Sequence, residues 1–157
     1  MSSDDVYLGN PNLKKANTQI EFTADQISEF IKCKKNPVYF AKKYVQIVNL
    51  DEGLVPFAPY KFQEKLIKRF HKERFNICKM PRQTGKSTTV VAYLLHYAVF
   101  NDSVNIGILA NKAATARDLL GRLQTAYENL PRWMQQGIVA WNKGSLELEN
   151  GSKILAA

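Results

Sequence analysis

The segment 76–95, NICKMPRQTGKSTTVVAYLL, holds the residues with the clearest potential for chemistry. Within PRQTGKS, Gly85 stands directly before Lys86 and Ser87, which is typical of a loop that binds nucleotide phosphates. Glycine lets the backbone approach closely, lysine reaches the β- and γ-phosphates, and the serine hydroxyl binds Mg²⁺. The strict motif has a glycine where this sequence has Met80. The context favours a nucleotide site over a chance tripeptide, because a β-prone segment (FNICKM, 75–80) precedes the loop and a long apolar pattern follows it.

Backbone N–H groups of such a loop form a concave nest, and the helix that begins at Lys86 directs its positive end at the same point. The free N–H of Thr88 is a candidate for an α-phosphate. Arg82 has two open interpretations: a cation that stabilises charge on the γ-phosphoryl group during transfer, or a surface arginine paired with an acidic neighbour. From these residues we predict that Lys86 contacts the phosphates, that Ser87 binds Mg²⁺, and that a nucleotide is bound by the loop residues Pro81, Arg82, Gln83, Thr84, Gly85, Lys86, Ser87 and Thr88.

Helical patterns lie ahead of the loop. A helix is expected from Thr23, which forms a capping-box pattern with Gln26. Pro37 ends this helix and starts a second, expected over 37–48, and a loop with Gly53 follows. A third helix is expected over 60–74, where apolar residues recur at helical spacing. The polar segment 1–22 is expected to be a flexible lead-in.

Strand and helix patterns alternate from residue 75 onward. They predict a strand at 75–80, a largely buried helix from Lys86, a strand at 104–110 and a helix at 111–131. Three short β segments follow, with turns at NKG and NG. This order predicts an α/β fold with a parallel-sheet core, preceded by helices and ending in a β meander.

Composition is that of a soluble globular domain: 157 residues, 45% hydrophobic and 23% charged. No run of about 18 apolar residues occurs, so no membrane-spanning helix is expected. Cys33 and Cys78 have no metal-binding spacing, which indicates two free thiols. The net charge of +8 comes largely from IKCKKN, AKKY and KLIKRFHKERF. Such clusters fit either a nearby polyanion or the solvated faces of helices.

The loop PRQTGKS resembles the Walker A variant of the large terminase subunits of tailed bacteriophages. The segments YKFQEKLIKRF, IGILANKAATARDLLGRL and GIVAWNKGSLELENGSKILAA are similar to the ATPase region of the contractile-tailed phage type, in the family's order. The resemblance runs from about Thr23 to the end of the chain. It implies a P-loop ATPase core like that of helicases and recombinases, incomplete here, with 23–59 as a helical N-terminal segment and 60–157 as part of the ATPase domain.

The resemblance also implies a function. Such proteins hydrolyse ATP, with Mg²⁺, to drive double-stranded DNA into a preformed capsid. Their in-loop arginine senses or stabilises the γ-phosphate, so the resemblance implies catalytic roles for Arg82 and Lys86 and ATP as the nucleotide. The implied partners are the portal protein, the small terminase subunit and further copies in a ring on the portal. The implied location is the cytoplasm of the infected bacterial host, at the assembling capsid. Gln63 matches the family's adenine-recognising glutamine, whose amide offers both a donor and an acceptor. Lys112 and Arg117 are implied DNA or coupling contacts, with solvated helix charges as the alternative.

Some elements of the family pattern are not found. The Walker B strand and its catalytic glutamate are expected beyond Ala157, and the nuclease domain is also absent. Asp51 and Glu52 follow apolar residues, but they precede the loop and are interpreted as a turn. We therefore expect a fragment of a longer motor that binds nucleotide and turns it over poorly alone. The alternatives are a fragment of a helicase-like DNA translocase, or a non-enzymatic basic binding module with a vestigial loop.

Overall fold

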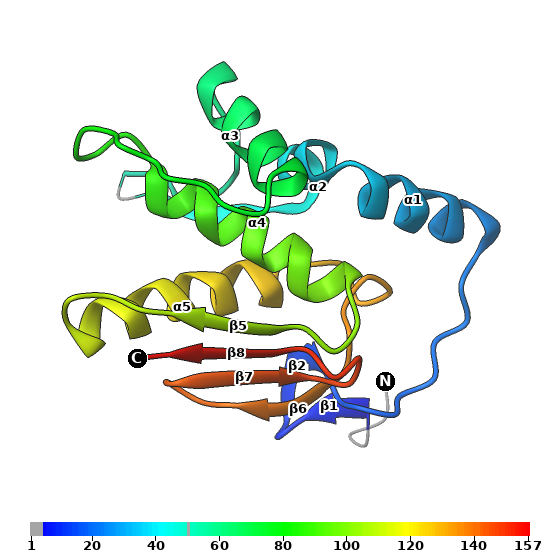
Figure 1. The fold of residues 1–157 in the computed structure, drawn as a ribbon. Helices are drawn as coiled ribbons and strands as arrows, with labels where there is room; N and C mark the ends of the chain where they lie inside the picture. The colour runs from blue at the N-terminus through cyan, green and yellow to red at the C-terminus, as the bar shows by residue number, and fades with distance from the viewer. Residues whose placement is uncertain (1–4, 50) are drawn as a thin grey trace.

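The computed structural model describes residues 5–49 and 51–157 as a mixed α/β fold. Its sheet lies on one side, α5 packs against the sheet, and α4 lies between α5 and the remaining helices (Figure 1). The helices are α1 (Ala24–Lys35), α2 (Pro37–Tyr44), α3 (Lys61–Lys72), α4 (Lys86–Phe100) and α5 (Ala113–Glu128). In the described ranges, no helix combines the length and apolar character needed to cross a membrane.

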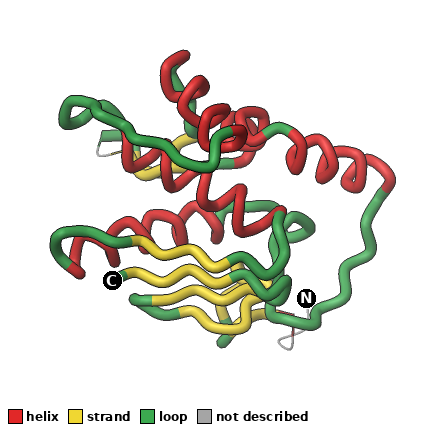
Figure 2. Tube along the Cα trace, in the orientation of Figure 1, coloured by secondary structure: helices red, strands yellow, loops and turns green. Residues whose placement is uncertain are grey.

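The main sheet contains four strands in the order β5-β8-β7-β6 (Figure 2). The strands are β5 (Asn105–Ile108), β6 (Ile138–Trp141), β7 (Ser145–Leu148) and β8 (Lys153–Ala156). Only β5 and β8 pair in parallel, whereas β8, β7 and β6 form the expected antiparallel meander. The alternation predicted for β7 is confirmed, since Leu146 and Leu148 are both 1% exposed. The parallel core expected from the sequence is thus limited to one strand pair.

The predicted helix signals are confirmed. Thr23 caps α1 through its hydroxyl, and Gln26 returns a bond to the Thr23 N–H, as a capping box requires. Pro37 is the first residue of α2, and Asn36 caps that helix. The wide apolar stripe of α4 is buried against α5 and α2, with Leu95 and Val91 among its core residues. Both cysteines are free, with Cys33 buried and Cys78 exposed.

The second helix is shorter than its pattern predicted. It ends at Tyr44, and residues expected to be its last turn form β3 (Gln46–Asn49). The segment expected to be a loop supplies the antiparallel partner β4 (Gly53–Pro56). Consecutive β-branched residues in VQIV favour a strand once a partner is present. Asp51 and Glu52 form the turn of this hairpin, as predicted.

The strand predicted at 75–80 is wrong, because this segment is irregular. Phe75 is 82% exposed and Ile77 is fully exposed. The segment lies beside α3 and α4, on the far side of α4 from the main sheet (Figure 1). A β-prone sequence needs a partner strand to form a ladder, and this segment has none among the described residues.

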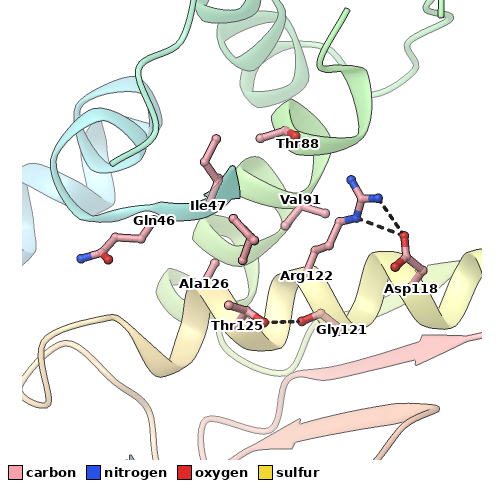
Figure 3. A pocket seen from close by; sticks show the side chains of 10 residues that line it. Gln46, Ile47, Thr88, Val91, Asp118, Gly121, Arg122, Thr125 and Ala126 are labelled. Atoms are coloured by element: carbon pink, nitrogen blue, oxygen red, sulfur yellow. Dashed lines mark hydrogen bonds and ion pairs between the residues drawn. The ribbon is translucent and has the colours of Figure 1, made fainter. Parts of the chain in front are cut away.

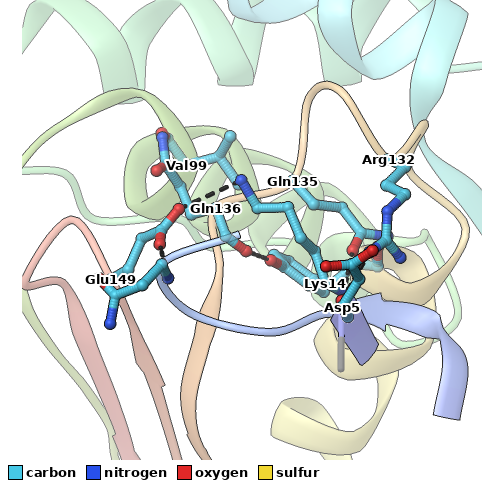
Figure 4. A network of polar contacts seen from close by, with 9 residues as sticks. Asp5, Lys14, Val99, Arg132, Gln135, Gln136 and Glu149 are labelled. Atoms are coloured by element: carbon cyan, nitrogen blue, oxygen red, sulfur yellow. Dashed lines mark hydrogen bonds and ion pairs between the residues drawn. The ribbon is translucent and has the colours of Figure 1, made fainter. Parts of the chain in front are cut away.

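Residues 5–17, the N-terminal strap, differ from the flexible lead-in expected over 1–22; residues 1–4 of that segment lie outside the described residues. They contain the paired strands β1 (Val6–Tyr7) and β2 (Asn10–Lys14), and Leu13 is 2% exposed. The strap lies against the β6 edge of the sheet, where Lys15 bridges to Ile138 (Figure 1). Polar side chains hold it in place, as Figure 4 shows. The amide of Gln135 bonds to the backbone of both Lys14 and Asn12.

Candidate functional site

The loop before α4 has the conformation of an anion-binding nest. Gln83 and Gly85 have positive φ angles of 60° and 72°, so the backbone turns sharply twice. Gly85 is the N-cap of α4 and offers no side chain to the helix. Among the described residues, no acceptor satisfies the backbone N–H groups of Lys86, Ser87 and Thr88. A 15-residue helix thus presents free donors and its positive end at one point.

Gly85 is tied to α3 by a close contact. Its carbonyl oxygen accepts from the Gln63 Nε2 at 3.3 Å, from the Thr89 hydroxyl at 2.8 Å and from the Thr89 N–H at 3.0 Å. A Cβ atom on Gly85 would lie 2.5 Å from Gln63 Nε2, closer than real contacts allow. Glycine is therefore favoured at this position for two reasons, its left-handed backbone and the approach of Gln63.

Lys86 is folded back onto the loop. Its Nζ donates to the carbonyl oxygens of Met80 at 2.7 Å and Pro81 at 3.0 Å. The Thr84 hydroxyl also donates to the Pro81 oxygen, at 3.0 Å. Phosphate oxygens are charged acceptors and bind an ammonium more strongly than neutral carbonyls do. The lysine can therefore exchange these two carbonyls for phosphate when an anion enters the loop.

Arg82 and Ser87 are both exposed. No carboxylate of the described residues lies within 4 Å of Arg82, so the pairing with an acidic neighbour that we considered is not observed. The described part of the chain holds no cluster of three His, Cys, Asp or Glu residues that could bind a metal ion. A cation at this loop would rely on the Ser87 hydroxyl and on the oxygens of its own anion.

A cavity of about 750 Å³ opens beside the loop. This volume lies within the range of small-molecule and cofactor sites. Its walls come from the β3–β4 hairpin, from 57–63 and from the loop and Thr88. Of the predicted nucleotide residues, the cavity is lined by Gln63, Gln83, Thr84, Gly85 and Thr88, whereas Pro81, Arg82, Lys86 and Ser87 are not part of its lining.

Gln63 is more constrained than its predicted role in base recognition implies. The side chain is 3% exposed, and its Oε1 accepts from the Tyr60 N–H at 2.8 Å. Since Nε2 contacts Gly85, each end of the amide already makes one hydrogen bond. One N–H and one lone pair remain for a ligand. Gln63 therefore connects the start of α3 to the loop, whatever it binds.

Several residues that line the cavity were not predicted to belong to the site, and three of them have side chains suited to contact a ligand. Tyr60 and Phe62 are 70% and 44% exposed, and their rings stack with centroids 5.8 Å apart and planes 9° from parallel. Exposed aromatic rings of this kind form a flat surface for a planar group. Glu52 lines the cavity as well, from the hairpin turn. Tyr60 and Phe62, on either side of Lys61, can be read from the sequence, but the packing of the β3–β4 hairpin beside them cannot.

A second cavity, of about 600 Å³, lies between β3, α4 and α5 (Figure 3). Ile47 and Thr88 line both cavities, so these two residues form a common wall. The Arg122 guanidinium pairs with Asp118 at 2.9 Å on the α5 side. Lys112 and Arg117, the sequence candidates for DNA contact, are exposed at the N-terminus and in the second turn of the same helix and line neither cavity.

The geometry defines a class of site: a glycine–lysine loop at a helix N-terminus, open to a cavity with an aromatic wall. A family model described as "Terminase large subunit, T4likevirus-type, N-terminal" matches residues 77–157, half of the chain. The chain belongs to this family. The match begins just ahead of the loop and includes α4, α5 and the main sheet, whereas α3 and the β3–β4 hairpin lie outside it.

Proposed function

We propose that this chain is the ATP-binding part of a phage DNA-packaging motor, in which ATP hydrolysis drives DNA into a capsid. Family membership supports a DNA-packaging role. The observation that carries the nucleotide assignment is the group of unsatisfied N–H donors at the start of α4, beside Lys86 and a cavity of suitable size. Each of these features is expected of a phosphate site, and their combination at one point supports an anion as the ligand.

Roles follow for the loop residues. Lys86 would move from the Met80 and Pro81 carbonyls to the β- and γ-phosphates, and the free N–H groups would hold the remaining oxygens. Ser87 would contribute its hydroxyl to Mg²⁺, which supplies charge neutralisation at the β- and γ-oxygens when bound. Arg82 is exposed and has no ion-pair partner among the described residues, so it is free to approach the γ-phosphoryl group.

The base would occupy the part of the cavity next to α3. Tyr60 and Phe62 offer a stacking surface there, and the remaining N–H and lone pair of Gln63 offer a donor and an acceptor to an adenine edge. A base seated there would place its phosphates toward Gly85, because Gln63 contacts that residue directly. The loop and α3 would thus bind opposite ends of one nucleotide.

We further propose the partners of such a motor: double-stranded DNA, a portal protein, a small terminase subunit and other copies of the chain in a ring. The full-length protein would be an ATPase that acts in the cytoplasm of the infected bacterium. Hydrolysis also needs a carboxylate that orients water, and we assign no residue of this chain to that role. Weak nucleotide binding with slow turnover is therefore expected of the 157-residue chain.

Calorimetric titration tests the proposal. The chain is titrated with Mg·ATP, Mg·ADP and sulfate, alongside the Lys86→Ala variant and the Lys79→Ala control, which removes an exposed lysine ahead of the loop. We expect ATP and ADP to bind more tightly than sulfate, and Lys86→Ala to lower ATP affinity at least ~100-fold, because a charge-assisted contact is lost. Lys79→Ala should have little effect.

Equal affinity for all three anions would instead favour a non-enzymatic anion-binding module. Unchanged ATP affinity in Lys86→Ala would remove the loop assignment. A helicase-like translocase is the remaining alternative. It differs in carrying a second motor domain in place of a nuclease domain in the full-length protein.

A further inference from the structure

Helix α3 has two faces of opposite character. Its inner face contacts the loop and α4: Ile67 is fully buried, Gln63 reaches Gly85, and the Phe70 carbonyl accepts from the Tyr93 hydroxyl at 3.0 Å. Its outer face is a stripe of exposed lysines, referred to below as the α3 stripe: Lys61, Lys65, Lys68 and Lys72. At 3.6 residues per turn, these spacings put all four within roughly 60° of arc. The stripe is therefore continuous and stands on a fixed helix at the periphery of the molecule (Figure 1).

The positive charge of the α3 stripe is only partly offset by nearby acidic groups. Between residues 61 and 79 there are seven Lys and Arg residues but only two glutamates. The Glu64 carboxylate forms an ion pair with Lys42 on α2, at 2.6 Å. The Glu73 carboxylate lies 3.9 Å from Lys72, and both of these side chains are exposed. No carboxylate of residues 5–49 and 51–157 lies within 4 Å of Lys61, Lys65 or Lys68. Four like charges in a row repel one another, and a bound polyanion relieves this repulsion.

The other basic clusters lack this arrangement. On α1, Lys34 and Lys35 point in different directions around the helix, and Lys32 lies over the Tyr39 ring, 4.1 Å from its centroid. On α2, Lys42 and Lys43 pair with Glu64 and Glu29, each at 2.6 Å. The lysines of α1 and α2 therefore either contact other groups of the fold or are spread around their helix instead of forming a row. In the α3 stripe, by contrast, aligned lysines coincide with a clear excess of positive over negative charge.

The chemistry of the stripe indicates its partner. On the arc of the helix surface that carries the four lysines, no apolar residue lies between them. A protein interface, by contrast, needs a dry apolar centre. The stripe is about 17 Å long, and one strand of a duplex carries a phosphate every ~3.4 Å along its axis. Lysines act as point charges on phosphates without selecting a sequence. We propose that the α3 stripe binds the sugar–phosphate backbone of double-stranded DNA; the choice of DNA rests on the proposed function, whereas the polyanion site rests on the charge geometry alone.

The test measures the anisotropy of a fluorescent 20-base-pair duplex in the presence of the full chain, without nucleotide, between 50 and 200 mM salt. We compare Lys65→Gln/Lys68→Gln with Lys34→Gln/Lys35→Gln, which removes the same charge from α1. Each phosphate contact adds about 0.9 to the slope of log affinity against log salt. We expect the slope to fall by about 2 and the affinity at 50 mM salt to fall at least ~10-fold in the α3 variant, with much smaller changes in the α1 variant.

Equal losses in the two variants would overturn the proposal, because they would report net charge alone. An unchanged slope in the α3 variant would also overturn it. Tighter binding of poly-L-glutamate than of the duplex to the wild type would overturn it as well, because that result would indicate an acidic protein partner. Circular dichroism checks that the exposed substitutions leave the fold intact. Lys86→Ala separates this proposal from the nucleotide site, since it should lose ATP binding and keep duplex binding.

Discussion

The loop at the start of α4 and the contacts of the N-terminal strap are both rich in polar groups, but these groups are satisfied to different degrees. In the strap, Lys14 is 7% exposed and its ammonium lies 3.2 Å from a Glu149 oxygen. The other Glu149 oxygen accepts from the Asn17 N–H at 2.8 Å, and Gln135 bonds to three backbone carbonyls (Figure 4). In the loop, by contrast, backbone donors point outward without acceptors and the lysine holds neutral carbonyls.

The difference distinguishes a structural polar cluster from a binding site. Buried polar groups are normally paired, and here the buried Lys14 ammonium and both carboxylate oxygens of the partly exposed Glu149 have partners within the fold. Donors that stay unpaired at a helix start are satisfied by water until an anion replaces it. The two regions should therefore respond differently to substitution: changes at the strap should alter stability, and changes at the loop should alter binding.

The largest expected effect comes from Glu149→Ala. It leaves the nearly buried Lys14 ammonium and the Asn17 N–H without their acceptor, which should lower the free energy of unfolding by roughly 3 kcal/mol. Urea denaturation of the variant and the wild type measures this. The control is Glu147→Ala, which removes a half-exposed pair with Lys153 at 3.0 Å and should cost under ~1 kcal/mol. Equal costs would mean that the strap network is not a buried cluster in solution.

Low pH should remove the stabilisation that Glu149 provides. Burial acts to raise the pKa of its carboxyl. Hydrogen bonds from the backbone of Asn17 and Gly137 and from Lys14 outweigh burial and lower the pKa below its usual 4.5. A carboxyl with a lowered folded-state pKa stabilises the fold above its unfolded pKa, and this contribution disappears as pH falls through the folded value. The stability difference between wild type and Glu149→Ala should thus be constant from pH 7 to 6 and shrink below about pH 4.5.

His96 also titrates in acid, and the comparison of the two proteins must remove its contribution to stability. Burial lowers the pKa of His96 from 6.5 to about 4, so the wild type loses stability as pH falls through this interval. The same loss occurs in Glu149→Ala, because His96 lies among α1, α2 and α4 rather than at the strap. Denaturation of both proteins at pH 7, 5, 4 and 3 separates the two effects. A stability difference that does not shrink between pH 5 and pH 3 would contradict the assigned ion pair.

The sequence predicted the local signals of this fold better than its long-range pairing. The capping box at Thr23, the proline start of α2 and the meander turns depend on neighbouring residues, and they are confirmed. The strand at 75–80 and the flexible lead-in, as far as it covers residues 5–17, are wrong, because strand formation at 75–80 and burial of Leu13 depend on what lies alongside in space. The Lys14–Glu149 pair joins residues at the two ends of the chain, and no local pattern contains it.

In the candidate site, too, local features were predicted from the sequence and long-range contacts were not. The loop residues around Gly85 were found from their spacing, because phosphate chemistry constrains consecutive positions. The cavity beside them was not found, since its wall comes from the β3–β4 hairpin, which the sequence suggested was a helix end and a loop. Gln63 was found by resemblance, but its contact with Gly85 was not expected. That contact links the two parts of the site and is the basis of the last prediction.

Gly85→Ala should affect both stability and binding, which no strap variant should do. Alanine would have to adopt the left-handed backbone at φ 72°, and its Cβ would lie 2.5 Å from Gln63 Nε2. The left-handed backbone costs about 1–2 kcal/mol, and the side-chain clash moves Gln63 away from the Gly85 carbonyl. Denaturation and Mg·ATP titration should therefore show a modest loss of stability together with weaker nucleotide binding.

Gly121→Ala is the matched control, because Gly121 lies within α5 and a Cβ there meets no atom within 4 Å. Alanine in a helix interior should stabilise the chain by up to ~1 kcal/mol and leave ATP affinity unchanged. If Gly85→Ala instead bound ATP as well as the wild type, the Gln63–Gly85 contact would not shape the nucleotide site. The loop and α3 would then have to be treated as independent elements that only happen to lie side by side.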